Sequence, residues 1–533
     1  MRLPIALFLA VAGLIGAAWY GLGRPVAMPA APIKAGEKLY CLSYAPFRGA
    51  QTPLDLSTEV TAAQVEEDLT RLAKITDCVR VYSVDFGLDK IAGIAARHGL
   101  KVWQGLWLSS TPRKNEYQIE TTVALAERHR DAITAVIVGN EVLLRGDMTA
   151  VDLGATIRAV KARVKVPVTY ADVWEFWLKN PALVNDVDFI TIHILPYWED
   201  LPIPASDAAA HVDAIRKIVA DRFPGKEVRI GEVGWPSAGR MREGALPSPV
   251  NQARVIQEVL ARAQAGNYRV NVIEALDQPW KRALEGTVGG HWGLFDDETR
   301  QFKFEWGAPV SNHPRWVWQA LGGIVYAFAV FAAAFYAGRG RSAARRTEFG
   351  VALCALAGGV TIGWSLENLA LESLGVPGWS RSLAMLACAL AIPPLAAMAL
   401  SRKVALPRFS RIIGPKAQRF NDPLMVTLGL VVMALAVLAI MVALGLVFDP
   451  RYKDFPFAPM TAAVVPLAVL GVMLPQAGKR GLAELIAAAL LTASVAFIVI
   501  NETFANWQSL WLCATLLVLG VTLARIRDAQ SPA

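Results

Sequence analysis

The 533-residue sequence predicts an α/β chain: a (β/α)8 TIM barrel followed by an all-α, polytopic transmembrane domain. Short apolar, β-rich runs recur between residues 39 and 280 and alternate with amphipathic helical patterns, which predicts the barrel. Beyond residue 315, apolar segments follow one another with few charges, which predicts the membrane domain. With 54% hydrophobic and 18% charged residues, the composition excludes a disordered chain, a collagen-like chain and an ordinary soluble enzyme.

The N-terminal segment, residues 1–23, is expected to be a transmembrane anchor or a signal peptide. The apolar run from Leu3 to Tyr20 is about 18 residues long, which favours a retained anchor. The small residues at 27–30 resemble a cleavage site, so both alternatives stay open. Residues 24–36 are rich in Pro and Ala and are expected to form a short tether.

Residues 37–312 are expected to form the barrel. The expected strands lie within Leu39–Phe47, Cys78–Ser83, Lys101–Leu108, Ala132–Val142, Pro167–Trp174, Asp188–Trp198, Glu227–Trp235 and Val270–Trp280. The expected helices include Ala62–Thr76, Thr121–Arg130, Val151–Arg163, Ala208–Phe223 and Asn251–Ala265. Because chemistry in this fold comes from the carboxyl ends of the strands, polar residues at the end of each apolar run are the candidates for a site.

Residues 316–524 are expected to hold seven transmembrane helices, and residues 525–533 a cytoplasmic tail. The expected spans are Trp316–Tyr336, Phe349–Leu366, Ser382–Leu400, Met425–Phe448, Ala458–Leu474, Leu482–Ile500 and Leu510–Leu523. Alternate loops carry 14 and 3 basic residues, which by the positive-inside rule places both termini in the cytoplasm and residues 25–315 outside. Glu367, Glu372 and Glu502 fall at outer ends of spans and are expected to be hydrated rather than to form a proton relay.

The net charge of +8 lies entirely in residues 316–533, so it reports membrane topology and no nucleic-acid partner is expected. Only two of the five cysteines, Cys41 and Cys78, lie in the polar part of the chain. If that part is extracytoplasmic, these two can form one disulfide. The sequence does not decide whether they are bridged. No His, Cys or Asp cluster has ligand spacing, so neither a metal nor another cofactor is expected.

Two glutamates follow buried-looking strands. Glu141 ends the fourth expected strand and Glu232 ends the seventh, so the two can face each other across the barrel mouth. A carboxylate pair across a cleft is the minimum apparatus for cleaving a glycosidic bond, with one carboxyl as acid and the other as nucleophile or base. Asn140, beside the first glutamate, can hydrogen-bond a sugar hydroxyl.

Aromatic residues gather at the same strand ends, where flat rings suit the faces of pyranose units. They are Trp107, Trp174, Trp177, Tyr197, Trp198, Trp235, Trp280 and Trp292. About half of them are expected simply to pack the top of the barrel.

At these positions the domain resembles glycoside hydrolase family 17, which contains β-1,3-glucanases and β-glucan transglycosylases. The matching segments are VGNEV at 138–142, GEVGWPS at 231–237, EALDQPWK at 274–281 and HWGLF at 291–295. The resemblance implies a retaining mechanism with Glu141 as acid/base and Glu232 as nucleophile. Gln278 departs from the family, which often has Glu there, so a charge in that subsite is in doubt.

The resemblance also implies a set of substrate-binding or positioning residues. With Asn140, they are Tyr44, Arg80, Tyr82, His193, Tyr197, Trp235, Glu274, Asp277, Lys281 and Trp292. On chemistry alone, Arg80 can hold Glu232 ionised. Lys281 and Glu274 can equally form an ordinary ion pair, and Asp277 can equally cap a loop.

A barrel of this kind joined to membrane helices resembles the membrane-bound proteobacterial β-(1,6)-glucan synthase-like group. The favoured function is therefore a membrane-anchored transglycosylase/hydrolase that acts on β-1,3-glucan in the periplasm. No glycosyltransferase signature is evident, so a separate glucan-producing glycosyltransferase is an expected partner, besides β-glucan and the inner membrane. The alternatives are a glucanase that only hydrolyses, a non-catalytic glucan-binding or export subunit, and a transporter with an appended sensor domain.

Overall fold

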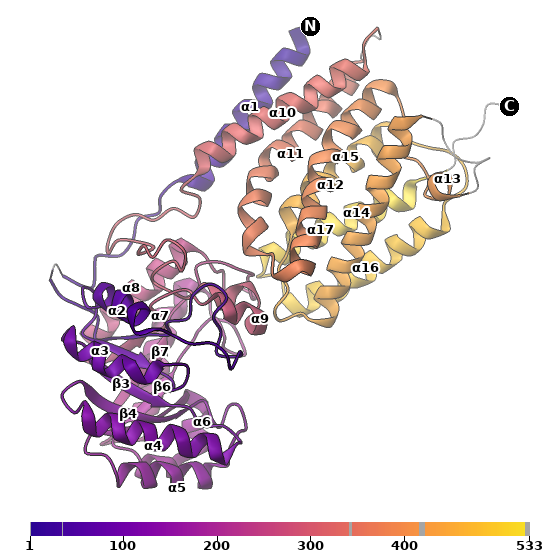
Figure 1. Ribbon diagram of the computed structural model, residues 1–533. Coiled ribbons are helices and arrows are strands. Elements are labelled where there is room, and N and C mark those ends of the chain that lie inside the picture. The colour runs from indigo at the N-terminus through magenta and orange to yellow at the C-terminus, as the bar shows by residue number, and fades with distance from the viewer. Residues whose placement is uncertain (1, 35, 341–343, 415–421, 528–533) are drawn as a thin grey trace. The chain divides into compact units, whose positions relative to one another are not determined.

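The computed structural model describes residues 2–34, 36–340, 344–414 and 422–527 (Figure 1). It contains two compact units. The barrel unit consists of Val26–Ala238 and Gly244–Val310. The helical unit consists of Met1–Pro25, Gly239–Glu243 and Ser311–Ala533.

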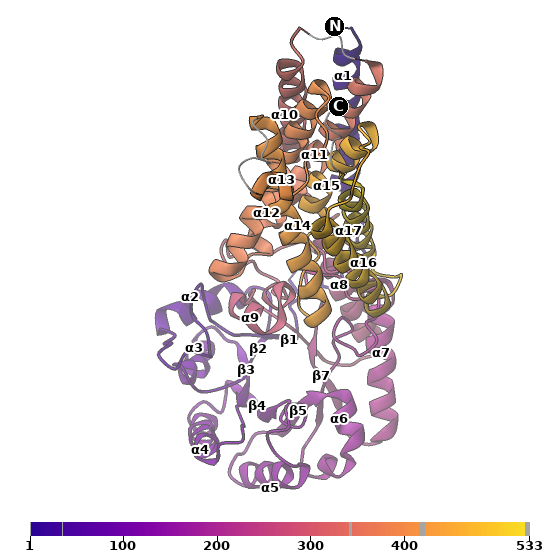
Figure 2. The ribbon, with the colours of Figure 1, turned by 90° about the vertical axis from the view of Figure 1, so that its right-hand side faces the viewer.

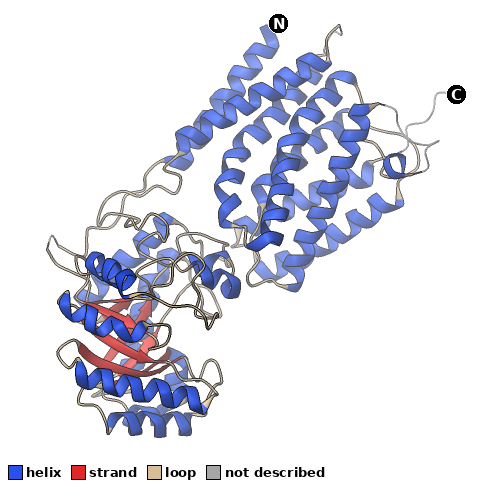
Figure 3. Cartoon of the chain, in the orientation of Figure 1, coloured by secondary structure: helices blue, strands red, loops and turns tan. Residues whose placement is uncertain are grey.

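The barrel unit is built on a closed sheet of parallel strands in sequential order, β1 to β8, drawn in red in Figure 3. The strands are β1 (Cys41–Ser43), β2 (Cys78–Val81), β3 (Lys101–Leu106), β4 (Ile133–Asn140), β5 (Val168–Val173), β6 (Ile190–His193), β7 (Val228–Val233) and β8 (Val270–Val272). Each lies inside one of the eight expected runs, so the predicted (β/α)8 fold is confirmed. The strands are shorter than those runs because the ends of the runs form the loops above the barrel.

The helices around the sheet follow the expected alternation. They are α2 (Ala62–Leu72), α3 (Ile91–Arg97), α4 (Pro112–Arg128), α5 (Ala150–Lys161), α6 (Trp174–Lys179), α7 (Ala205–Arg222), α8 (Pro249–Ala265) and α9 (Arg282–Glu285), with 3₁₀ turns η1 (Leu88–Lys90), η2 (Pro181–Asn185), η3 (Pro279–Lys281) and η4 (Thr287–Gly290). Side chains of Thr61, Thr149 and Ser248 cap α2, α5 and α8, which fixes where these helices begin. The short helices α3, α6 and α9 were not expected, because they are too brief to show a period.

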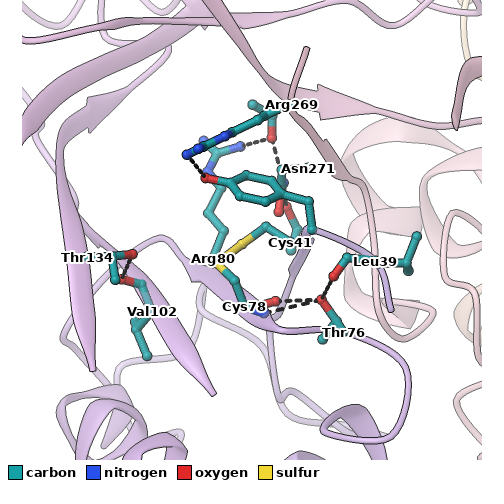
Figure 4. Close-up of a disulfide and its surroundings, with 12 residues drawn as sticks. Leu39, Cys41, Thr76, Cys78, Arg80, Val102, Thr134, Arg269 and Asn271 are labelled. Atoms are coloured by element: carbon teal, nitrogen blue, oxygen red, sulfur yellow. Dashed lines mark hydrogen bonds between the residues drawn. A yellow bond between two sulfur atoms is a disulfide. The ribbon is translucent and has the colours of Figure 1, made fainter. Parts of the chain in front are cut away.

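A disulfide joins Cys41 to Cys78 at the amino ends of β1 and β2, the end of the barrel opposite the candidate site (Figure 4). The two strands pair in register, Leu42 with Val79, which brings the cysteine Cα atoms to 4.3 Å. Both cysteines are buried. This answers the question that the sequence left open.

The helical unit has a helix at each of the seven expected C-terminal segments (Figure 2). Its helices are α1 (Arg2–Gly23), α10 (Trp316–Ala337), α11 (Arg345–Leu371), α12 (Gly375–Arg402), α13 (Ser410–Ile413), α14 (Pro423–Phe448), α15 (Phe457–Met473), α16 (Leu482–Glu502) and α17 (Trp507–Arg525). Seven of them, α1 included, are long and apolar enough to cross a membrane, whereas α15 is shorter.

Helix α1 packs on α10 and α11 within this unit. Ile15 and Trp19 are fully buried, and the Phe8 ring meets the Phe328 ring edge-on at 5.8 Å. Glycines allow close approach between α10 and α11, since a Cβ on Gly323 would lie 2.1 Å from the carbonyl oxygen of Gly359. Helix α1 is therefore part of the packed core of the helical unit.

The expectation that Glu502 is hydrated is wrong. Its side chain is 6% exposed and pairs with Arg240, which is 3% exposed. Asn506 donates to Glu502 Oε2 at 2.8 Å, and the Arg240 guanidinium lies over the Phe455 ring at 4.6 Å. The apolar surroundings of both charges make the ion pair necessary, because an unpaired buried charge is very costly.

Candidate active site

Both candidate carboxylates lie at the carboxyl ends of strands. Glu141 directly follows β4, and Glu232 is the fifth residue of β7. Glu141 has a φ of +53°, and two residues earlier Gly139 has a φ of +85°. A Cβ on Gly139 would lie 2.6 Å from a methyl of Val142, so the turn that carries Glu141 needs glycine there.

The two carboxylates share one imidazole. An oxygen of Glu141, an oxygen of Glu232 and a ring nitrogen of His193 lie within 4.8 Å of one another. The register of β6 and β7 pairs His193 with Glu232, which places the imidazole beside the second carboxylate. His193 Nδ1 lies 2.8 Å from Glu141 Oε1, and Nε2 lies 3.6 Å from Glu232 Oε1.

The Arg80 guanidinium fixes the tautomer of His193. Arg80 Nη2 lies 3.2 Å from His193 Nε2, and a guanidinium can only donate. We therefore assign Nε2 as the acceptor. Nδ1 then carries the hydrogen and donates a hydrogen bond to Glu141 Oε1. Burial alone would raise the pKa of Glu141, but this hydrogen bond and the nearby charges of Arg80 and Arg145 outweigh burial and lower it.

Arg80 and Tyr82, both from the β2 end of the barrel, hold Glu232. Arg80 Nη1 and the Tyr82 hydroxyl each donate to Glu232 Oε1 at 2.9 Å. Arg80 also donates to Gly231 O at 2.6 Å and to Asn140 Oδ1 at 2.5 Å, so it connects the ends of β7 and β4. Burial and the charge of Glu232 raise the pKa of Tyr82 well above its usual value, so its hydroxyl remains a donor.

Lys281 and Glu274 form the ion pair that the sequence allowed. Lys281 Nζ lies 2.9 and 3.1 Å from the two oxygens of Glu274, which is 1% exposed. Burial would lower the pKa of Lys281, but the charges of Glu274 and Glu285 outweigh it and raise the pKa to about 12. The ammonium therefore stays protonated beside the carboxylate cluster.

Tyr44, Asp277 and Gln278 are buried and hydrogen-bonded to neighbouring residues. Tyr44 is 1% exposed and donates to Asp68 at 3.0 Å, and Asp277 binds Lys303 at 2.7 Å. Asp277 also accepts from Gly293 N at 2.8 Å, so it caps a loop as the alternative predicted. Gln278 is fully buried and donates to Ala45 O, so this position carries no charge.

Half of the aromatic residues pack the top of the barrel, as expected. Trp177, Tyr197, Trp235 and Trp292 are at most 3% exposed. Trp107, Trp174, Trp198 and Trp280 are partly exposed. These four rings keep some contact with solvent, although the Arg145 guanidinium lies over the Trp107 ring at 4.2 Å. Binding by Tyr197, Trp235 and Trp292 stays a prediction.

Two acidic residues lie at the site that the sequence motifs do not single out, Glu285 and Asp172. Glu285, on α9, lies close enough to Glu141 and Glu232 that burial and their charges raise its pKa. Asp172, at the end of β5, is fully buried near Glu141 and His193. The spacing of Glu285, four residues after Lys281, was an available signal, whereas Asp172 looks like an ordinary residue of an alternating strand.

Residues 41–293 match the family described as BtgE/BtgC glycoside hydrolase domain. The glucan 1,3-beta-glucosidase of Saccharomyces cerevisiae is 24% identical over 257 residues, which cover 44% of this chain and 82% of the relative. The probable beta-glucosidase btgE of Aspergillus flavus is 31% identical over 232 residues, which cover 42% of this chain and 37% of the relative.

Among solved structures, the chain is similar to a glycoside hydrolase family 17 beta-1,3-glucanosyltransferase from Rhizomucor miehei. The identity is 24% and the TM-score 0.45, over 50% of this chain and 97% of that one. Within the matched residues, the VGNEV and GEVGWPS segments carry Glu141 and Glu232 at the ends of β4 and β7. The barrel of this chain is therefore a glycoside hydrolase domain that is similar to the BtgE/BtgC domain over residues 41–293.

Proposed function

We propose that this protein is a membrane-anchored, retaining β-glucan transglycosylase/hydrolase that acts on β-1,3-glucan outside the cytoplasmic membrane. One observation carries the proposal: an oxygen of Glu141 and an oxygen of Glu232 lie within 4.8 Å of each other. Retaining glycosidases place their carboxyl groups about 5–5.5 Å apart, whereas inverting enzymes need about 6.5–9.5 Å to admit water.

In the first step, Glu141 protonates the glycosidic oxygen while Glu232 attacks the anomeric carbon, and the reducing-end sugar leaves. Arg80 and Tyr82 both bind Glu232 Oε1, so we assign the attack to Oε2. His193 holds one oxygen of Glu141, and the other carries the proton toward the leaving group. The glycosyl group is then bound to Glu232 as an ester until an acceptor reacts with it.

In the second step, Glu141, now ionised, takes a proton from the acceptor, and the acceptor oxygen displaces Glu232 from the anomeric carbon. Water as acceptor gives hydrolysis, and a sugar hydroxyl gives transfer. Partly exposed rings such as Trp107 and Trp280 provide platforms for an acceptor sugar. We favour transfer, in the branching or remodelling of a glucan made by a separate glycosyltransferase.

The location outside the bacterial inner membrane has two supports. The basic residues concentrate in alternate loops of the helical unit, which favours cytoplasmic termini. The Cys41–Cys78 disulfide favours an oxidising compartment for the barrel.

The experiment incubates the full-length protein with a β-1,3-gluco-oligosaccharide and follows product mass and linkage. We expect products longer than the substrate, absent with Glu232→Gln. Glu227→Gln is the matched control, because Glu227 precedes the same strand at the opposite end of the barrel and is exposed. If every product is shorter than the substrate, the protein only hydrolyses and the proposed transfer is wrong. If folded wild type and Glu232→Gln are equally inert, a non-catalytic glucan-binding subunit becomes the better account.

A further inference from the structure

A groove runs between helices α15 and α17 of the helical unit. Its first part is a cavity of about 330 Å³, lined by Trp511, Ala514 and Val518 of α17 and by the facing residues of α15. Its second part, of about 240 Å³, also begins at Val518 and ends at Arg525. Because Val518 lines both parts, they form one continuous groove, which we call the α15–α17 groove.

The hydroxyl groups along the α15–α17 groove are already bonded within the protein. Thr515 donates to Trp511 O at 2.9 Å, and Thr522 donates to Val518 O at 2.7 Å. Thr461 donates to a carbonyl of its own helix at 2.7 Å and accepts from Trp511 Nε1 at 2.8 Å. These hydroxyls keep no donor for a ligand, and the other lining side chains except Arg525 are apolar or aromatic. The groove therefore suits a hydrocarbon chain better than a polar ligand.

The groove opens on the surface of the helical unit and has the length of a lipid chain. Val472, Val518 and Val521 on its walls are exposed, although α17 is apolar enough to cross a membrane. From Trp511 to Arg525 the groove extends about 21 Å along α17, at 1.5 Å per residue. The hydrocarbon core of a bilayer is about 30 Å thick, so each leaflet contributes about 15 Å. The groove can therefore hold a whole acyl chain of one leaflet.

The end of the groove at Arg525 is basic. Arg525 is exposed, and among the described residues no carboxylate forms an ion pair with it. Arg480 and Arg527 form a backbone bridge beside the end of α17, and Lys479 precedes Arg480. Both Lys479 and Arg480 are exposed. Basic groups at the end of an apolar groove between membrane helices complement a negatively charged lipid headgroup.

We infer that the α15–α17 groove binds a phospholipid with an anionic headgroup. One acyl chain lies between the two helices, and the phosphate lies at Arg525. The inference rests on the proposed membrane anchoring, because a phospholipid reaches this groove only from a bilayer. A helix of a second copy fits the groove less well. Two copies in one membrane have the same orientation, so each would bring its own Arg525 to the same basic end, where like charges repel.

The test measures binding of phosphatidylglycerol and phosphatidylcholine to delipidated full-length protein by native mass spectrometry. The two lipids carry the same acyl chains, and only phosphatidylglycerol is anionic. We expect wild type to bind phosphatidylglycerol about fivefold more tightly, which is the effect of one Arg near an anionic lipid. Arg525→Gln should lose this preference. Ala514→Phe places a ring in the groove from an exposed position, so it should weaken the binding of both lipids.

Arg339→Gln and Ala329→Phe are the matched controls. Ala329 is exposed on α10, and Arg339 is exposed just beyond the end of α10, so neither lines the groove. Both variants should bind the two lipids as wild type does. The inference is overturned if Arg525→Gln keeps the preference for phosphatidylglycerol, if Arg339→Gln loses it equally, or if Ala514→Phe binds both lipids as tightly as Ala329→Phe.

Two further readouts distinguish this inference from other accounts. If wild type is a dimer in the same spectra and Ala514→Phe is a monomer, the groove is a contact between copies and the inference is wrong. Extraction of membranes with alkaline carbonate tests the anchoring itself. If carbonate releases wild type, the proposed membrane anchoring fails first. If wild type stays in the membrane but binds the two lipids equally, only the inference fails.

Discussion

At the scale of single residues, Arg80 is the group on which the site geometry depends most. One guanidinium contacts Glu232, Asn140 and His193 at 2.5–3.2 Å, so it links three strand ends. A lysine keeps the charge but has one nitrogen on a flexible stem and cannot reproduce the planar fork.

We therefore expect Arg80→Lys to lower kcat about 100-fold, with a smaller effect on KM, because the loss falls on transition-state positioning. Steady-state kinetics on a β-1,3-gluco-oligosaccharide measures this. Arg229→Lys is the control, since Arg229 lies on β7 and stacks on Phe189 away from the carboxylates. Equal kinetics for the two variants would contradict the assigned role of Arg80.

How far the sequence predicts the site can be argued from particular residues. Glu141 and Glu232 could be found because each follows an apolar run, and a barrel brings strand ends together. Asp172 could not, since alternation in a strand does not show whether an inward polar residue meets solvent or a neighbour. Glu502 was misjudged for a related reason: its partner Arg240 is 262 residues away.

At the scale of elements, the disulfide links the first two strands of the barrel. It closes a loop with a sequence separation of 37 residues, which restricts the unfolded chain more than the folded one. Sequence alone could not decide the pairing, because it depends on the register of β1 against β2. The strands themselves were predictable from their apolar runs.

The variant Cys41→Ser/Cys78→Ser should lose about 3 kcal/mol of barrel stability while keeping its activity at low temperature. Thermal unfolding of the full-length protein, with and without reductant, measures this. Reductant should lower the Tm of wild type and leave that of the variant unchanged. Cys388→Ser, which alters a buried unpaired cysteine, should keep the response to reductant. If reductant leaves the Tm of the wild type unchanged, the Cys41–Cys78 disulfide is contradicted.

At the scale of the whole molecule, topology determines where the glycoside hydrolase domain works. The alternation of basic loops predicts a barrel outside and the 475–481 loop inside. The native cysteines should react little with a thiol-labelling reagent. Cys354, Cys388 and Cys513 are buried, and Cys41 and Cys78 form a disulfide.

Single cysteines on the exposed residues Glu298 and Lys479 test this arrangement. In spheroplasts, a membrane-impermeant maleimide should label Glu298→Cys at once and Lys479→Cys only after lysis. The reverse pattern would place the barrel in the cytoplasm and remove the proposed access to periplasmic glucan.

The central claim is that Glu232 forms a covalent glycosyl intermediate while Glu141 serves as acid/base. The most direct measurement uses a 2-deoxy-2-fluoro-β-glucosyl fluoride, which slows breakdown of the intermediate, followed by peptide mass spectrometry of the full-length protein. We expect one glycosyl adduct, located on Glu232 and absent from Glu232→Gln. An adduct on another carboxylate, or turnover of β-1,3-glucan with inversion at the anomeric carbon, would contradict the account.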